Sequence, residues 1–259
     1  MIALRTAVAL VAAMAAGASA LAEIPMDQRK SGADFMSAGT RAMQADDMAN
    51  PAMLSTLDGE SLWNEKAGSA RKSCSDCHGA APQSMKGVAA RYPAFDAARN
   101  APIDLAGRVN ACRADRQGAE PFKAESAPLL ALTAYVGLQS RGMPVAPSDD
   151  PRLKPFRARG EAIWNARIGQ LNFSCAQCHD DNWGKRLGSA SIPQAHPNAY
   201  PIYRLEWQGM GSLQRRFRNC MSGVRAQAYP YGAQEFIDLE LFLMHRARGM
   251  AVETPGVRP

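Results

Sequence analysis

The sequence predicts an all-α protein that contains two tandem copies of one helical module, preceded by an N-terminal extension. Apolar residues recur at helical spacing over residues 127–139 and 234–246, whereas few segments show the alternation of a half-buried strand. A set of short motifs occurs twice in the same order. The 259 residues suffice for two modest domains, and 46% hydrophobic with 21% charged residues excludes a disordered or collagen-like chain.

The N-terminus has the pattern of an export signal. Residues 1–22 contain one cation, Arg5, then an apolar run, and end in Ala20-Leu21-Ala22. This pattern predicts a signal peptide cleaved before Glu23 and a mature protein in the periplasm. An uncleaved membrane anchor is the alternative, but the apolar run is short and rich in small side chains. No later stretch is apolar enough to span a bilayer, and the formal net charge of +6 is too scattered to predict nucleic-acid binding.

The internal duplication is visible as five landmarks. The first copy contains GESLWN from Gly59, CSDCH from Cys74, Tyr92-Pro93, Arg108 four residues before Cys112, and Arg141-Gly142-Met143. The second contains GEAIWN from Gly160, CAQCH from Cys175, Tyr200-Pro201, Arg216 four residues before Cys220, and Arg248-Gly249-Met250. Five landmarks in one order indicate two copies of one module. The second copy has seven extra residues around 185–197, which we expect to form a surface loop.

These landmarks divide the chain. We predict an extension at residues 23–55, helical around 33–43 and packed on the first module, which spans 56–145. A proline-rich linker at 146–156 leads to the second module at 157–259. Each module should have a helix over its G-E-x-x-W stretch, a short helix with C-x-x-C-H, a helix ending near its lone cysteine, and a final amphipathic helix.

The two C-x-x-C-H motifs predict two covalently bound c-type haems. Cys74 and Cys77, like Cys175 and Cys178, lie on one helical turn, from which two thiols can reach the two vinyl groups of a porphyrin. The next residue, His78 or His179, then lies under the iron as its proximal ligand. A redox dithiol or a zinc site is the alternative, but neither needs a histidine after each pair. Each module is therefore expected to be a small cytochrome c-like fold.

The sixth ligand of each iron has several candidates. Met143 and Met250 occupy matching places, but each lies in a Gly-Met turn better suited to closing the last helix. His196 and His245 have no counterpart in the first copy, so we interpret them as ordinary histidines. The matched pair Cys112 and Cys220 is therefore the natural proposal, with a thiolate on each iron.

A disulfide between Cys112 and Cys220 is the competing interpretation, because leftover cysteines often pair in an oxidising compartment. However, a disulfide does not explain why both copies keep R-x-x-x-C. An arginine one helical turn before a cysteine lowers the pKa of the thiol and favours thiolate. Thiolate ligation would also lower the reduction potential of the haem, which suits sulfur chemistry better than a simple electron shuttle.

Two C-x-x-C-H modules, each with one further cysteine, and the run Arg216-Phe217-Arg218-Asn219-Cys220 resemble the SoxA family. SoxA proteins are cytochrome subunits of the SoxAX complex of bacterial sulfur oxidation, and the likeness covers essentially the whole chain after the signal. The resemblance implies an L-cysteine S-thiosulfotransferase, which joins thiosulfate oxidatively to a cysteine of the SoxYZ carrier protein. It also implies a SoxX-like monohaem cytochrome as partner and a cytochrome c as electron acceptor.

The resemblance also implies roles for individual residues. Cys220 would be both axial ligand of the second haem and the sulfur that becomes a persulfide, and Arg216 would bind the substrate. Cys112 would ligate the first haem, and His78 and His179 would be the proximal ligands. Thiosulfate is a dianion, and several arginines near Cys220 offer suitable donors: Arg215, Arg216, Arg218 and Arg225.

Two other functions remain open at this point. A dihaem electron carrier without catalysis would place Met or His on the iron and would bond Cys112 to Cys220. A thiosulfate dehydrogenase that makes tetrathionate from two free thiosulfates would need no protein cysteine as acceptor.

Overall fold

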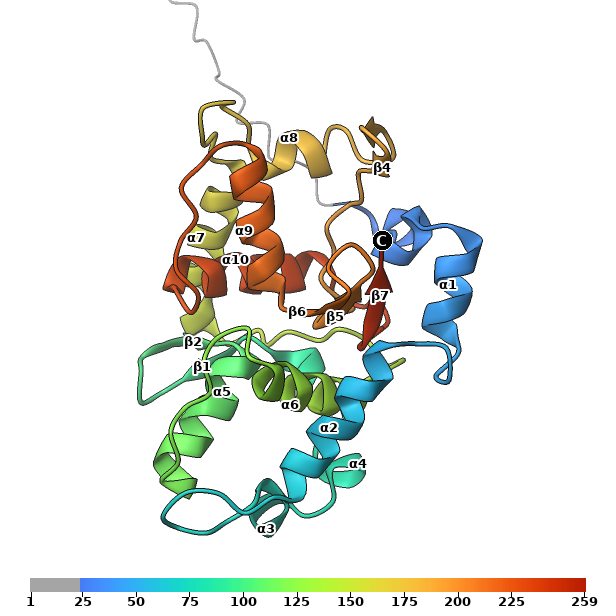
Figure 1. The fold of residues 1–259 in the computed structure, drawn as a ribbon. Helices are drawn as coiled ribbons and strands as arrows, with labels where there is room; N and C mark the ends of the chain where they lie inside the picture. Colours follow the sequence, from blue (N-terminus) through green and yellow to red (C-terminus); the bar gives the residue numbers. More distant parts are fainter. Residues whose placement is uncertain (1–23) are drawn as a thin grey trace, which may run out of the picture.

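The computed structural model describes residues 24–259, so the predicted signal peptide at 1–22 lies outside the described residues. Figure 1 shows two helical halves, one above the other. The first half contains α2 (Ala52–Asn64), α3 (Cys74–His78), α4 (Ala81–Ser84), α5 (Leu105–Cys112) and α6 (Ala127–Leu138). The second half contains α7 (Lys154–Asn165), α8 (Cys175–His179), α9 (Leu213–Gly223) and α10 (Gln234–Arg246). Within residues 24–259, no helix is long and apolar enough to cross a membrane.

In each half the first long helix crosses the last one at a glycine. A Cβ atom on Gly59 of α2 would overlap the carbonyl group of Ala131 in α6, and one on Gly160 of α7 would overlap the carbonyl group of Asp238 in α10. The repeated G-E-x-x-W motif therefore begins with the only residue type that permits this close approach. Its tryptophan is buried one turn later: Trp63 is 4% exposed and Trp164 is 3% exposed.

The short helices α3 and α8 begin at capping boxes. The Ser73 hydroxyl accepts a hydrogen bond from the backbone N–H of Asp76, whose carboxylate accepts one from the backbone of Ser73. Ser174 and Gln177 form the same reciprocal pair in the second half. These caps satisfy backbone donors at the start of each helix and fix the first turn, which holds both cysteines of C-x-x-C-H.

The prediction of an all-α protein with little strand needs correction. The described residues contain seven short strands, among them the antiparallel hairpin of β1 (Ala94–Asp96) with β2 (Ala101–Ile103). In the second half, β5 (Ile202–Arg204) pairs antiparallel with β6 (Gly209–Gly211) and parallel with β7 (Gly256–Arg258). The hairpin of β3 (Arg186–Leu187) with β4 (Ala190–Ser191) lies in the insertion. Strands of two or three residues are too short to show an alternating pattern in the sequence.

The two halves meet where their Gly-Met turns pair. The backbone N–H of Gly142 donates to the Val252 carbonyl at 2.8 Å, and the N–H of Val252 donates to the Met143 carbonyl at 2.9 Å. The N–H of Val145 also donates to the Met250 carbonyl at 2.8 Å. Met143 and Met250 thus lie in the chain reversals that follow α6 and α10, in agreement with their assignment as turn residues.

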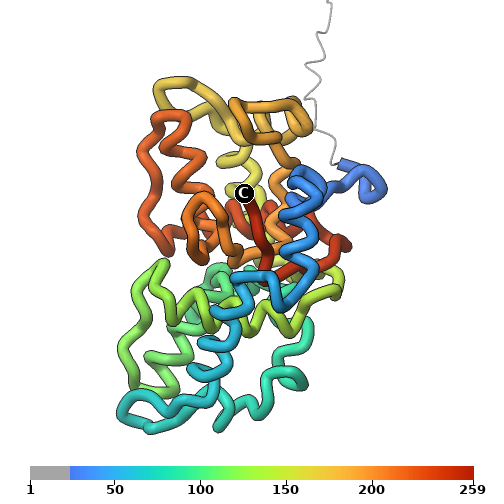
Figure 2. The backbone as a smooth tube through the Cα atoms, turned by 45° about the vertical axis from the view of Figure 1, so that its right-hand side comes forward, coloured from blue at the N-terminus to red at the C-terminus, as the bar shows by residue number. Residues whose placement is uncertain are grey.

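The N-terminal extension, expected to pack on the first module, contacts that module through the ion pair of Asp47 with Arg141 but packs mainly on the second half. It forms η1 (Met26–Gln28), η2 (Gly32–Phe35) and α1 (Ala38–Ala45), with α1 beside β7 (Figure 2). The backbone N–H of Lys30 donates to Gln194 Oε1 at 2.7 Å, and the Lys30 carbonyl lies 2.9 Å from His196 Nδ1. Buried polar side chains of the second half therefore bind this segment and hold it there.

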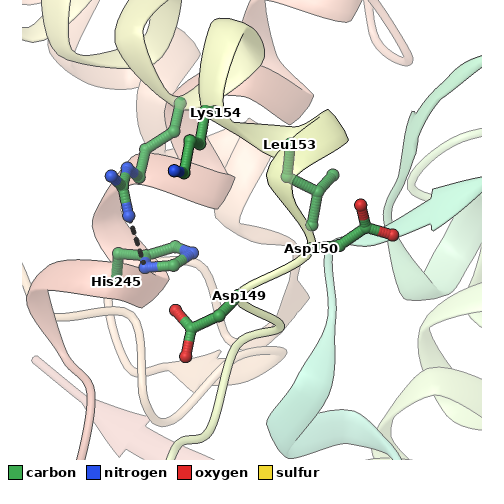
Figure 3. A pocket seen from close by; sticks show the side chains of 6 residues that line it. Asp149, Asp150, Leu153, Lys154 and His245 are labelled. Carbon is green, nitrogen blue, oxygen red and sulfur yellow. Dashed lines mark hydrogen bonds between the residues drawn. The ribbon is translucent and has the colours of Figure 1, made fainter.

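The linker lines a cavity. Residues Pro151–Leu153 form η5, which leads directly into α7. Beside it, a cavity of about 270 Å³ is lined by Asp149, Asp150, Leu153, Lys154, Arg157 and His245 (Figure 3). Arg157 Nη1 lies 3.2 Å from His245 Nδ1, so the histidine is an acceptor within a charged cluster.

Candidate functional site

In the second half, α8 and α9 bring together four residues that are far apart in the sequence. Cys175, Cys178 and His179 lie on α8, and Cys220 lies on α9, whose start is capped by the Ser212 side chain. Burial and the nearby charge of Cys220 raise the pKa of the Cys175 thiol to about 12, and they raise the pKa of Cys178 as well. The predicted haem cysteines, proximal histidine and lone cysteine therefore share one site.

The ring of His179 is held in a defined orientation. Its Nδ1 atom lies 2.6 Å from the Pro193 carbonyl oxygen, so Nδ1 carries the proton and Nε2 is left for another partner. The ring also lies 5.7 Å from the Trp164 ring, centroid to centroid. His78 has the same contact with Trp63, at 5.8 Å, but its ring forms no hydrogen bond with another residue of 24–259.

Pro193 belongs to the insertion that we expected to be a surface loop, and this expectation holds only for part of it. The tip formed by β3 and β4 is largely exposed, with Leu187 72% exposed. Beyond Pro193 the segment turns inward: Gln194 is fully buried and His196 is 6% exposed. The insertion thus supplies both the acceptor for His179 and the binding groups for the N-terminal extension.

The thiol of Cys220 is unusually acidic. Burial alone would raise its pKa, but a hydrogen bond with His179 and the positive charges of Arg216 and Arg204 outweigh burial and lower the pKa from 9.0 to about 7. A substantial fraction of this thiol is therefore thiolate at neutral pH, and thiolate is the form that ligates metals and attacks sulfur.

The arginines predicted around Cys220 differ in where they point. Arg215 stacks on Trp207, with its guanidinium carbon 4.3 Å from the ring centroid, and Arg218 stacks on Tyr231 at 4.7 Å. Arg225 is exposed. In contrast, the guanidinium of Arg216 makes no hydrogen bond or ion pair with any other described residue, and its charge acts on Cys220.

Arg204 is a cation at the site that the sequence analysis missed. It ends β5, well before α9 in the sequence, and only the folding of the hairpin brings it near Cys220. A signal existed in the duplication, because Arg204 lies four residues after the tyrosine of the repeated Tyr-Pro, where the first copy has Asp96.

The first half assembles the matching set with different electrostatics. Burial and the nearby charge of Cys112 raise the pKa of the Cys74 thiol. Burial also raises the pKa of Cys112, and the charge of Arg108 offsets this only in part. Arg108 Nη2 forms an ion pair with Asp96 Oδ2 at 2.9 Å. All six cysteines are free, so Cys112 and Cys220 are not joined by a disulfide in this structure.

The donor set of the second half fits a covalently attached c-type haem. Two thiols lie on one helical turn, the next residue is a histidine of fixed tautomer, and a thiol of lowered pKa faces that histidine from another helix. Within residues 24–259, no group of three or more His, Cys, Asp or Glu side chains is arranged to hold a metal ion directly.

Comparisons with known proteins agree with this geometry. The family model SoxA/TsdA, cytochrome c domain, matches the chain twice, at residues 58–145 and 159–252. The L-cysteine S-thiosulfotransferase subunit SoxA of Pseudaminobacter salicylatoxidans is 41% identical over 90% of this chain and 82% of its own. The SoxA subunit of Paracoccus pantotrophus is 36% identical over 88% of this chain and 78% of its own. The crystal structure of SoxXA from P. pantotrophus superposes with a TM-score of 0.86 at 35% identity, covering 89% of this chain and 87% of that chain.

Proposed function

Since the chain belongs to the SoxA family, we propose that it is the catalytic cytochrome subunit of an L-cysteine S-thiosulfotransferase. In this reaction thiosulfate is joined oxidatively to a cysteine of a SoxYZ-type carrier protein. The observation that carries the proposal is the Cys220 thiol, which has a pKa of about 7, faces His179 and lies one helical turn from the unpaired Arg216. Four relatives that are named as L-cysteine S-thiosulfotransferase subunits match the chain at 32–41% identity.

Two covalently bound c-type haems are part of the proposal. Cys74 and Cys77 would hold one haem and Cys175 and Cys178 the other, each through thioether bonds. His78 and His179 would be the proximal iron ligands, and Cys112 and Cys220 would each supply a thiolate to the same irons. Bound haem supplies an acceptor for the two electrons that are released when two sulfur atoms are joined.

Cys220 carries the sulfur chemistry in this proposal. With Cys220 as a persulfide, its outer sulfur bonds to the sulfane sulfur of thiosulfate, and this oxidation releases two electrons. The thiolate of the carrier cysteine then attacks that sulfane sulfur. The attack forms the carrier S–S bond and breaks the bond to the Cys220 persulfide, which leaves in its original form. Arg216 holds the sulfonate end, whose oxygens match the two-donor fork of a guanidinium.

The proposed partners follow from the same assignment. The superposed structure is a SoxXA complex, which supports a SoxX-like monohaem cytochrome as partner. Electrons would pass on to a cytochrome c acceptor in the periplasm. The free Cys112 and Cys220 count against the simple electron carrier, which predicts a disulfide between them. The acidic thiol facing His179 favours a protein sulfur as participant, which a tetrathionate-forming dehydrogenase does not need.

The decisive experiment is reconstitution with the haem-loaded chain, its monohaem partner, a SoxYZ-type carrier, thiosulfate and oxidised cytochrome c. We expect mass spectrometry to show a thiosulfonate adduct on the carrier cysteine, with two cytochromes reduced per adduct. Cys220→Ser should abolish the adduct, whereas the matched change Cys112→Ser should preserve it. Formation of tetrathionate without carrier modification would overturn the proposal.

A further inference from the structure

The segment from the repeated Tyr-Pro to the lone cysteine folds alike in both halves. In each half a three-residue strand is followed by a turn, a second strand and a capped helix. Matching positions share even the left-handed backbone, with φ at +51° for Asn100 and +49° for Gln208. Asp104 caps α5, and Ser212 caps α9 at the matching place. The two halves can therefore be compared residue by residue here.

The comparison pairs Arg108 with Arg216, and Asp96 with Arg204. Asp96 ends β1, its side chain is 8% exposed, and its Oδ2 atom accepts from Arg108 Nη2 at 2.9 Å. Its other oxygen accepts from the backbone N–H of Ala98 at 2.9 Å. The charge of Arg108 is thus paired with a buried, fixed carboxylate, which weakens its attraction for an anion beside Cys112.

The same position in the second half carries the opposite charge. Arg204 ends β5, its side chain is 16% exposed, and its Nε atom donates at 2.7 Å to a main-chain oxygen of the exposed Pro259, the last residue of the sequence. Its Nη2 atom lies 2.6 Å from Glu206 Oε2, but the Glu206 side chain is 63% exposed, so solvent screens this ion pair strongly. These contacts hold Arg204 in place without giving it a buried counter-charge.

Arg204 and Arg216 consequently repel each other beside one sulfur atom. Burial lowers the pKa of Arg204, and the charge of Arg216 lowers it further. Arg216 has no hydrogen-bonding or ion-pair partner among the described residues. Two guanidinium groups without a buried carboxylate form an environment that a small dianion stabilises, because Arg216 can offer its whole fork and Arg204 can still offer Nη1, whereas its Nε and Nη2 atoms contact Pro259 and Glu206.

We propose that Arg204 is a specificity-determining residue that forms, together with Arg216, a two-guanidinium site for the sulfonate end of thiosulfate beside Cys220. The inference rests on the proposed function and deepens it, since it explains why the second half binds the anion. In the first half, Asp96 at the matching position neutralises the arginine that would otherwise bind it.

The kinetic test compares Arg204→Gln and Arg204→Lys with the matched control Asp96→Asn, all in the haem-loaded chain with its monohaem partner. Arg204→Gln should raise KM for thiosulfate roughly ten-fold or more and change kcat less than about three-fold, because it weakens ground-state and transition-state binding alike. Arg204→Lys keeps the charge but loses the two-donor fork, so its KM for thiosulfate should lie between those of the wild type and Arg204→Gln. Asp96→Asn should keep the wild-type KM. An unchanged KM in Arg204→Gln, or an equal rise in Asp96→Asn, would overturn the inference.

A binding measurement separates this inference from the proposed function. Calorimetric titration of the same complex with thiosulfate, without carrier or electron acceptor, should show an affinity loss of roughly ten-fold in Arg204→Gln and none in Asp96→Asn. Haem content and far-ultraviolet circular dichroism verify that each variant is folded. A complex that binds thiosulfate through Arg204 but never conjugates it would refute the proposed function alone. Normal conjugation with wild-type thiosulfate affinity in Arg204→Gln would refute this inference alone.

Discussion

Gln214 donates from its Nε2 atom to Asp104 Oδ2 at 3.0 Å, and this buried bond joins the starts of the two helices that carry the lone cysteines. Asp104 caps α5 by accepting from the backbone N–H of Gly107 at 2.7 Å. The other amide atom of Gln214 accepts from the N–H of Gly232 at 2.8 Å. Asp104 is 9% exposed and Gln214 is 7% exposed, so both polar groups depend on hydrogen bonds within the protein.

The first prediction concerns this bond. Gln214→Leu removes the donor and leaves a buried carboxylate oxygen without that partner, so the free energy of unfolding should fall by about 1–3 kcal/mol. Urea denaturation of the haem-loaded chain measures the loss. Gln83→Leu is the control, because Gln83 is exposed, and it should change stability by less than about 0.5 kcal/mol. Equal losses in the two variants would show that the bond between the halves contributes nothing specific.

The second prediction concerns pH. Burial lowers the pKa of His245 to about 4, and the charges of Arg157 and Arg248 act in the same direction. In the unfolded chain this pKa returns to about 6.5. As pH falls from about 6.5 toward 4, the unfolded chain therefore binds a proton that the folded chain does not, and stability is lost.

The variant His245→Gln isolates this effect, because glutamine keeps an acceptor for Arg157 but does not titrate. The stability of His245→Gln relative to wild type should rise as pH falls from 7 to 4.5. The difference in unfolding free energy between the two proteins should change by less than about 1.4 kcal/mol per pH unit, which is the limit for one proton. It stays below this limit because the half-exposed ring is partly screened by solvent. Parallel stability curves for the two proteins would contradict the prediction.

The third prediction concerns haem number and the lone cysteines. The mass of the intact mature protein should exceed that of the chain by two haems, and the double variant Cys74→Ala, Cys77→Ala should retain one. Thiol mapping of the holoprotein should recover separate Cys112 and Cys220 peptides, because all six cysteines are free in the structure. A disulfide-linked Cys112–Cys220 peptide would contradict the assignment of both residues as iron ligands.

Much of the helical architecture could be predicted because its signals are local or repeated. The apolar spacing over residues 234–246 predicts the helix Gln234–Arg246 that the structure contains, and the repeated glycines at 59 and 160 mark the two helix crossings. Local periodicity and repetition need no knowledge of long-range contacts.

The parts that could not be predicted depend on long-range contacts. The binding of Lys30 to Gln194, the support of His179 by the Pro193 carbonyl and the position of Arg204 beside Cys220 all join segments that are separate in the sequence. The arginines of α9 show that closeness in the sequence also fails to predict which side chains serve the site. Arg215 and Arg218 lie close to Cys220 in sequence, yet both stack on aromatic rings instead.

The last prediction concerns Arg216 and Arg108, which occupy matching places in the two halves but should affect turnover differently. Arg216 has no hydrogen-bonding or ion-pair partner among the described residues, so Arg216→Met should leave folding and haem content intact. Loss of its charge-assisted contact with thiosulfate should slow conjugation roughly ten- to hundred-fold. Arg108→Met should leave turnover nearly unchanged.

The same two variants differ in their expected effect on stability. Arg108→Met removes the closer ion-pair partner of the Asp96 carboxylate, which is 8% exposed, and leaves only Arg99 at 3.9 Å, so the unfolding free energy should fall by about 1–3 kcal/mol. We expect Arg216→Met to lose turnover and Arg108→Met to lose stability. Turnover with the carrier and urea denaturation of the holoprotein, measured for both variants, check this. Equal slowing of conjugation by both substitutions, or loss of haem in Arg216→Met, would mean that Arg216 has no distinct role in substrate binding.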